Sequence, residues 1–109
     1  MKELLEAAVA KFNAKVEKDE GLRRELEGME KKVLVEVKEG PKYHFILKDH
    51  RVDGVRDGGV EAPDITVIAD QTTLTGLLRG EIGPMKALAT NKLKVKGSLD
   101  DLLRIRKFF

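Results

Sequence analysis

Cysteine is absent from this sequence of 109 residues. Its absence excludes a disulfide framework, a thiolate metal site and a cysteine nucleophile. Other residues of acid–base and nucleophilic catalysis are scarce, since His44 and His50 are the only histidines and Ser98 is the only serine. The sequence also lacks a nucleophile elbow, a dinucleotide-binding glycine motif, a phosphate-binding loop and a zinc-protease motif. Catalytic constellations are therefore sparse, and no cofactor is expected.

Long apolar runs are absent as well. No stretch approaches the ~18 consecutive apolar residues of a membrane-spanning helix. The start of the chain is charged throughout and lacks the apolar core and the cleavage site of a signal peptide. A chain of this length is long enough for one two-layer core. We expect a single domain over residues 1–109, located in the cytoplasm.

Amide side chains are few, whereas charged side chains are abundant. Gln71, Asn13 and Asn91 are the only amides, and charged residues make up 37% of the chain, against roughly 25% in an average domain. This composition is typical of proteins from thermophiles. The formal net charge is only +2, but residues 86–109 carry seven basic and two acidic side chains, a local charge of +5. The basic residues are therefore concentrated near the C-terminus.

Helices are predicted at both ends of the chain. Apolar residues three and four apart predict a helix from Lys2 to about Lys18, and a short second helix ends near Gly28. Later helices are predicted from capping residues. One follows Asp70, one begins at Pro84, and one is opened by a capping box at Ser98.

Strands are predicted between these helices. Alternation of apolar and polar residues predicts five of them, over residues 32–38, 43–48, 51–56, 65–69 and 92–96. Short turns join consecutive strands, which favours an antiparallel meander. Helices gathered at the two ends must cover one face of the sheet. We therefore predict an α+β fold with a five-stranded, mostly antiparallel sheet covered on one face by helices.

The polar segment around His50 is the candidate for a metal site. Asp49, Asp53 and Asp57 supply oxygen ligands near His50, but the segment lacks the spacing and the closing glutamate of a calcium loop. A polar hairpin turn explains these residues, so no metal is expected. The basic residues near the C-terminus lack interleaved aromatic residues, so no nucleic-acid partner is expected either.

The C-terminal segment mixes apolar and basic residues and has several explanations. A buried last helix, the lid of an apolar pocket and a surface that touches lipid would each account for it. From the pattern alone, a packed core is favoured over a ligand tunnel. The residues in question are Leu102, Leu103, Arg104, Ile105, Arg106, Lys107, Phe108 and Phe109.

Two stretches, DEGLRRELEGMEKKVLVEV and PDITVIADQTTLTGLLRGEIGPMKALATNKLKVKGSLDDLLRI, resemble the sterol carrier protein type 2 domain family. The first resembles the amphipathic helix that precedes the first strand in that family. The second resembles its strand beginning Pro63-Asp64-Ile65-Thr66, the polar cap Asp70, the helix end Gly80, the short helix at Pro84 and the strand from Asn91 to Gly97. The resemblance covers the chain from Glu3 onward, and residues 63–103 are its most specific part.

The resemblance implies an apolar tunnel between the sheet and the helices. In that family the tunnel takes sterols, fatty acids, acyl-CoA or other lipids, including isoprenoid types. The resemblance therefore implies a module that carries or presents a lipid to membranes or enzymes and that is not itself an enzyme. Binding would rest on buried apolar area, with broad selectivity. The tunnel residues that we expect are Phe45, Leu47, Leu77, Leu78, Ile82, Met85, Leu88, Val95, Leu102, Leu103, Ile105 and Phe109.

Two questions about partners stay open at the level of the sequence. In one interpretation, Phe108 and Phe109 insert at the headgroup boundary of an anionic membrane in a transient contact. Arg104, Arg106 and Lys107 then hold the last helix down. In the other, the phenylalanines are buried and the charges only solubilise the protein. An alternative function is a packed interaction or accessory module without ligand, docking through its C-terminal helix. A third interpretation, an enzyme that uses Asp49, His50, Asp53 and Asp57, predicts a metal requirement. The sequence does not fix the oligomeric state.

Overall fold

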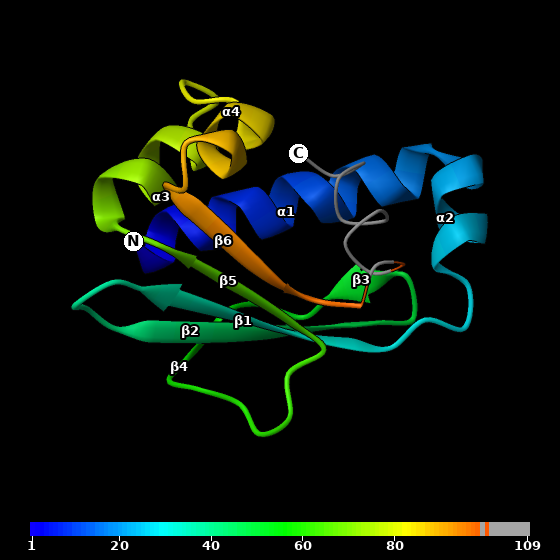
Figure 1. Ribbon diagram of the computed structural model, residues 1–109. Helices are drawn as coiled ribbons and strands as arrows, with labels where there is room; N and C mark the ends of the chain where they lie inside the picture. Colours follow the sequence, from blue (N-terminus) through cyan, green and yellow to red (C-terminus); the bar gives the residue numbers. More distant parts are fainter. Residues whose placement is uncertain (99, 101–109) are drawn as a thin grey trace.

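The computed structural model describes residues 1–98 and residue 100. Its helices are α1 (Lys2–Lys18), α2 (Glu20–Leu26), α3 (Gln71–Leu78) and α4 (Pro84–Ala89). Its strands are β1 (Lys31–Val37), β2 (Lys42–Lys48), β3 (Arg51–Val52), β4 (Arg56–Asp57), β5 (Ile65–Ala69) and β6 (Leu93–Gly97). The strands form one sheet, and α1, α3 and α4 lie on the same side of it (Figure 1). The predicted α+β fold with helices on one face of the sheet is confirmed.

The sheet is mixed and mostly antiparallel. Its strand order is β3-β2-β1-β5-β6, and β4 pairs with β2 beside this path. The pairs β1–β2, β2–β3, β2–β4 and β5–β6 are antiparallel, whereas β1 and β5 are parallel, with Val33 opposite Ile65 and Val37 opposite Ala69. The predicted mostly antiparallel sheet is therefore confirmed, with six strands in place of five and one parallel pair.

The antiparallel meander ends earlier than the sequence predicted. Residues 58–64 pass along the face of the sheet opposite the helices and bring β5 to the far side of β1 (Figure 1). The prediction that consecutive strands are neighbours is thus wrong for β5, because a longer connection takes the place of a tight turn. A connection of this kind is what a parallel pair requires, since a two-residue hairpin cannot join parallel strands.

The predicted third strand is divided into two short strands. Gly54 lies between β3 and β4 with a positive φ of 141°, a conformation that side chains with a Cβ rarely adopt. Val55 follows it and is buried in the core. The glycine therefore ends β3 and lets the chain turn a valine inward before β4 pairs with β2.

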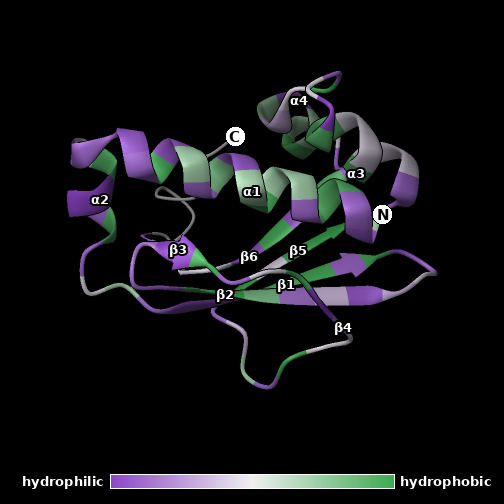
Figure 2. Cartoon of the chain, turned by 180° about the vertical axis from the view of Figure 1, so that it is seen from behind, coloured by the Kyte–Doolittle hydropathy of each residue, from purple (hydrophilic) through white to green (hydrophobic). Residues whose placement is uncertain are grey.

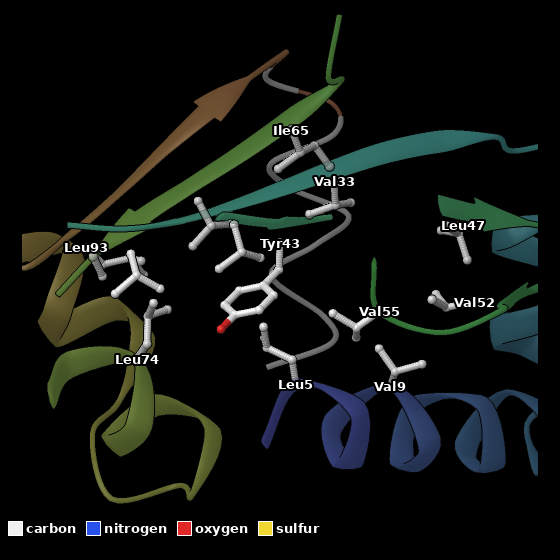
Figure 3. Packing of buried hydrophobic residues seen from close by; sticks show 14 of the residues in the cluster. Leu5, Val9, Val33, Tyr43, Leu47, Val52, Val55, Ile65, Leu74 and Leu93 are labelled. Atoms are coloured by element: carbon white, nitrogen blue, oxygen red, sulfur yellow. The ribbon is translucent and has the colours of Figure 1, made fainter. Parts of the chain in front are cut away.

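The core lies between the sheet and α1. Buried residues alternate along β5, and in β1 Val33 and Val35 belong to the face that includes Val37, because the side chains of a strand alternate between its two faces. Leu34, on the other face of β1, is buried as well. Along α1, hydrophobic and hydrophilic residues form alternating bands (Figure 2). Leu5 and Val9 of α1 point toward the sheet (Figure 3), which buries their apolar surface against these strands.

Polar contacts fix the position of α1 at two points. The side chain of Asn13 accepts a hydrogen bond from the Val52 backbone N–H at 2.9 Å and donates one to the Val52 carbonyl at 2.8 Å. Near the other end, Lys2 Nζ donates to Asp57 Oδ2 at 2.9 Å, which raises the pKa of Lys2. Helix α1 is therefore tied to β3 and to β4, the two short strands beside β2.

The later helices begin where the sequence predicted. Asp70 caps α3, its carboxylate accepting a hydrogen bond from the Thr73 backbone N–H at 2.7 Å. Pro84 is the first residue of α4. The predicted helix after Ser98 falls on residues 99 and 101–109, outside the described residues.

Replacing Asn13 by alanine is expected to destabilise the fold. Val52 is only 3% exposed, so its N–H and carbonyl would lose a partner with little access to water. We expect the free energy of unfolding in urea to fall by about 1–3 kcal/mol. Lys11→Ala, on the exposed side of the same helix, serves as the control and should change it by less than about 0.5 kcal/mol. Equal effects of the two substitutions would show that the Asn13 contact does not stabilise the fold.

The cap of α3 is expected to weaken in acid. The hydrogen bonds from Thr73 lower the pKa of Asp70 below its ordinary value of 3.8. A carboxyl whose pKa is lower in the folded state stabilises the protein above its unfolded pKa, and loses this contribution as the pH falls through its folded pKa. Compared with Asp70→Asn, which keeps an uncharged cap, the wild type should therefore lose stability as the pH drops below 3.8. Urea unfolding of both proteins across this range measures the difference. A constant difference would contradict the expectation.

Candidate ligand-binding cavity

A cavity of about 170 Å³ lies between the helices and the sheet. The described residues that line it come from α1, from α3, from the segment before β1 and from all five strands of the path β3-β2-β1-β5-β6. From the helical side and that segment they are Leu5, Ala8, Val9, Phe12, Met29, Leu74, Leu77 and Leu78. From the sheet they are Lys31, Val33, Val35, Phe45, Leu47, Val52, Ile65, Val67 and Leu93.

The strand register gives the cavity a direction. Lys31 lies opposite Leu47, and Leu47 lies opposite Val52, so these three residues form one end. Leu93 lies at the other end, because it pairs with Ala69, which in turn pairs with Val37. From Lys31 to Val37 a strand rises about 20 Å, at roughly 3.3 Å per residue. The cavity therefore runs along β1.

Helix α1 roofs the cavity along the same direction. Leu5, Ala8, Val9 and Phe12 all line it, at the spacing of three and four residues that places side chains on one face of a helix. Asn13 is fixed beside Val52, so the Phe12 part of α1 lies at the Lys31 end. Leu5 lies near Tyr43 (Figure 3), toward the α3 end.

The wall is apolar except at one end. Lys31 is the only charged residue among the described residues that line the cavity, and it is partly exposed. No buried side-chain nitrogen or oxygen of the described residues lacks a hydrogen-bond partner. The cavity therefore offers an apolar guest dispersion contacts along its length and offers a polar group one place, beside Lys31.

The size of the cavity limits what it holds in this conformation. Its volume of about 170 Å³ is similar to that of an engineered cavity of about 150 Å³ that binds benzene. A sterol or a complete acyl chain is larger than benzene. Binding such a ligand therefore requires the walls to separate.

Four of the predicted tunnel residues line the cavity, and four others do not. Phe45, Leu47, Leu77 and Leu78 are lining residues, and their contact with a ligand stays a prediction. The four predicted tunnel residues outside the lining are Ile82, Met85, Leu88 and Val95.

Helix α4 turns its large apolar side chains outward. Its buried residue is Ala87, whereas Met85 is 55% and Leu88 is 38% exposed. Ile82 packs on α3, where its side chain occupies the space beside Gly76, and Val95 is partly buried against the core. Met85 and Leu88 are thus absent from the described lining of the cavity, and their place opposite the last helix stays a prediction. The predicted contacts Leu102, Leu103, Ile105 and Phe109, and the docking residues Arg104, Arg106, Lys107 and Phe108, lie outside the described residues.

The role of α1 was not predicted from the sequence. Its apolar stripe was visible as a helix face, but the spacing does not say whether that face packs tightly or borders a cavity. The small side chain of Ala8 was the available signal, because a small residue in an apolar stripe leaves space above the sheet. Lys31 lies just before the strand predicted over residues 32–38, and no local pattern marks it as a cavity residue.

Asp57 of the candidate metal segment and His44 of β2 have partners within the chain. His44 Nδ1 lies 2.9 Å from the Gly58 carbonyl oxygen, and Asp57 pairs with Lys2. Within residues 1–98 and 100, no three His, Asp or Glu side chains form a group suited to a metal ion. None of the helices in that part of the chain is long and apolar enough to span a bilayer.

Comparison with known proteins identifies a family. The model of the SCP-2 sterol transfer family matches residues 9–109. Among solved structures, the ubiquinone synthesis protein UbiJ-SCP2 is 23% identical with a TM-score of 0.68, and the match covers 98% of this chain and 94% of that chain. Palmitated SCP2L2 from Aedes aegypti is 18% identical with a TM-score of 0.61, over 94% and 90% of the two chains. No curated protein sequence matches this chain.

Enzymes are also among the similar structures. The inverting sec-alkylsulfatase Pisa1 from Pseudomonas sp. is 15% identical with a TM-score of 0.62. The match covers 79% of this chain, which spans only 13% of the sulfatase. At these identities the likeness shows the fold alone. The family model, which extends over most of the chain, shows that the chain belongs to the SCP-2 sterol transfer family, a family of lipid-binding carriers.

Proposed function

We propose that residues 1–109 act as one domain that binds a lipid in the cavity beneath α1 and carries or presents it to membranes or enzymes. The observation that carries this proposal is the cavity itself, an apolar space along β1 between the two layers of the fold. Apolar surface in such a site binds apolar ligands at about 25 cal/mol per Å² buried. The domain would bind a sterol, a fatty acid, an acyl-CoA or an isoprenoid-type lipid without catalysing a reaction.

Similar proteins support a carrier or presenting role. The Aedes aegypti protein is described as palmitated, and a protein of ubiquinone synthesis shares the fold. In the sulfatase, the matching region is a small part of a much longer chain. All three similar proteins are compatible with a domain that holds an apolar molecule for another protein or a membrane.

The C-terminal segment completes the proposal. Leu102, Leu103, Ile105 and Phe109 would close the ligand space, and Phe108 with its basic neighbours would contact anionic membranes. The alternative is a packed accessory module that docks through this segment and holds no ligand. The modest volume of the cavity, about 170 Å³, favours that alternative if the walls do not separate.

Lipid binding is tested directly on the purified protein. We expect organic extraction followed by mass spectrometry to release a co-purified lipid, and we expect the fluorescence of cis-parinaric acid to rise on addition of protein that has been stripped of lipid. A protein that releases no lipid and leaves the fluorescence unchanged would refute the carrier function and leave the accessory module.

Filling the cavity is expected to compete with the ligand. Ala8 lines the cavity, whereas Ala7 is exposed on the same helix. Ala8→Leu should lower the affinity for cis-parinaric acid about tenfold or more, because the added methyl groups occupy the ligand's space. Ala7→Leu makes the same chemical change outside the cavity and should leave the affinity unchanged. Equal affinities of the two variants would place the ligand elsewhere on the protein.

A further inference from the structure

We infer that Lys31 selects lipids with an anionic head, binding a carboxylate or phosphate at its end of the cavity. This inference rests on the proposed lipid-carrier function and adds the class of ligand. Among the described residues that line the cavity, Lys31 alone is charged, and the sixteen others are apolar. An amphiphile bound there must place its head where a polar partner or water exists, because an unpaired polar group is costly to bury.

The register places Lys31 where a ligand head would lie. Lys31 begins β1 on the same face of the strand as Val33 and Val35, which border the cavity. At its level the sheet offers Leu47 and Val52, and neither side chain has a polar atom. Lys31 is partly exposed, so this end of the cavity reaches water. The head of an amphiphile therefore finds both a cation and solvent there.

The opposite end accepts only an apolar tail. Leu74, Leu77 and Leu78 of α3 and Leu93 of β6 border it, and none of them offers a hydrogen bond from its side chain. An extended chain lying along β1 with its head at Lys31 thus meets hydrocarbon at its far end. The polarity of the lining orients the ligand with its head at the start of β1.

The charge of Lys31 decides between kinds of head. An ammonium group attracts carboxylate and phosphate through charge-assisted hydrogen bonds, which are roughly twice as strong as those between neutral groups. A hydroxyl group, as in a sterol or a fatty alcohol, is uncharged and forms a weaker hydrogen bond with the ammonium group. Lys31 also takes part in an interaction within the chain. Since an ammonium group has three donors, a ligand does not require it to be unpaired.

The neighbouring lysine provides a matched control. Lys32 follows on the same strand, but its side chain belongs to the opposite face of the sheet, because successive residues of a strand alternate. It is partly buried like Lys31, and it does not line the cavity. Lys31→Met and Lys32→Met remove one positive charge each, from opposite faces of the same strand.

The experiment measures binding of cis-parinaric acid, of the corresponding alcohol and of its phosphate monoester to the wild type and both variants. Lys31→Met should weaken binding of the acid and the phosphate on the order of tenfold and leave binding of the alcohol unchanged. Lys32→Met should change none of the three. A loss for the phosphate alone would assign the site to phosphate heads, and a loss for the acid alone to carboxylates. Equal losses for all three ligands in Lys31→Met would overturn the inference.

A second measurement separates electrostatic contact from a structural role. When palmitate labelled with ¹³C at its carboxyl is bound, a nearby cation should lower the pKa of that carboxyl. NMR titration should therefore give a lower pKa in the wild type than in Lys31→Met, and an unchanged pKa would contradict the contact. If the wild type binds none of the lipids, the carrier function itself fails. If it binds the alcohol as tightly as the acid, the carrier function stands and the role of Lys31 fails.

Discussion

The placement of α1 over β1 governs the rest of this structure. Asn13 bonds to both backbone groups of the buried residue Val52, which fixes the distance and direction of the helix at one end of the sheet. The apolar stripe of α1 then lies along the strand, and the space beneath it becomes the cavity. The direction of the cavity, its apolar end and its charged end all follow from this alignment.

The cavity persists because of the sizes of the residues that face one another. Ala8 on α1 faces a surface of valines that includes Val33, Val35 and Val67, and small or β-branched side chains cannot reach across the gap. A void costs about 24 cal/mol per Å³, so a volume of about 170 Å³ corresponds to roughly 4 kcal/mol. A lipid that filled it would recover a free energy of this order, which links the imperfect packing of the core to binding.

The sequence predicts the elements of this fold better than their arrangement. Periodicity located α1 and β5, and the cap at Asp70 located α3, because these signals are local. The parallel pairing of β1 with β5 was missed, since alternation of apolar residues is the same in parallel and antiparallel strands. It depends instead on the path of residues 58–64 across the sheet, which no local pattern encodes.

The site was predicted in part, for the same physical reason. Leu77 and Phe45 lie on elements whose inner faces are clear from periodicity, and both line the cavity. Met85 lies on a helix too short to show a periodic face, and the helix packs through Ala87 instead. Lys31 follows Glu30 and precedes Lys32 in a charged run, and only the strand register separates the residue that faces the cavity from its neighbours.

Affinity and selectivity have different sources in this cavity. The apolar lining contributes binding free energy in proportion to the apolar area that is buried. This contribution depends little on which hydrocarbon chain fills the cavity. A single cation contributes less to the total, but its contribution differs between an anionic head and a neutral one. Specificity is a difference between affinities, so one charged residue in a cavity of hydrocarbon can define the class of ligand while the apolar residues supply most of the binding. This division of roles would account for a lining that, among the described residues, is apolar except for Lys31 at the end that reaches water.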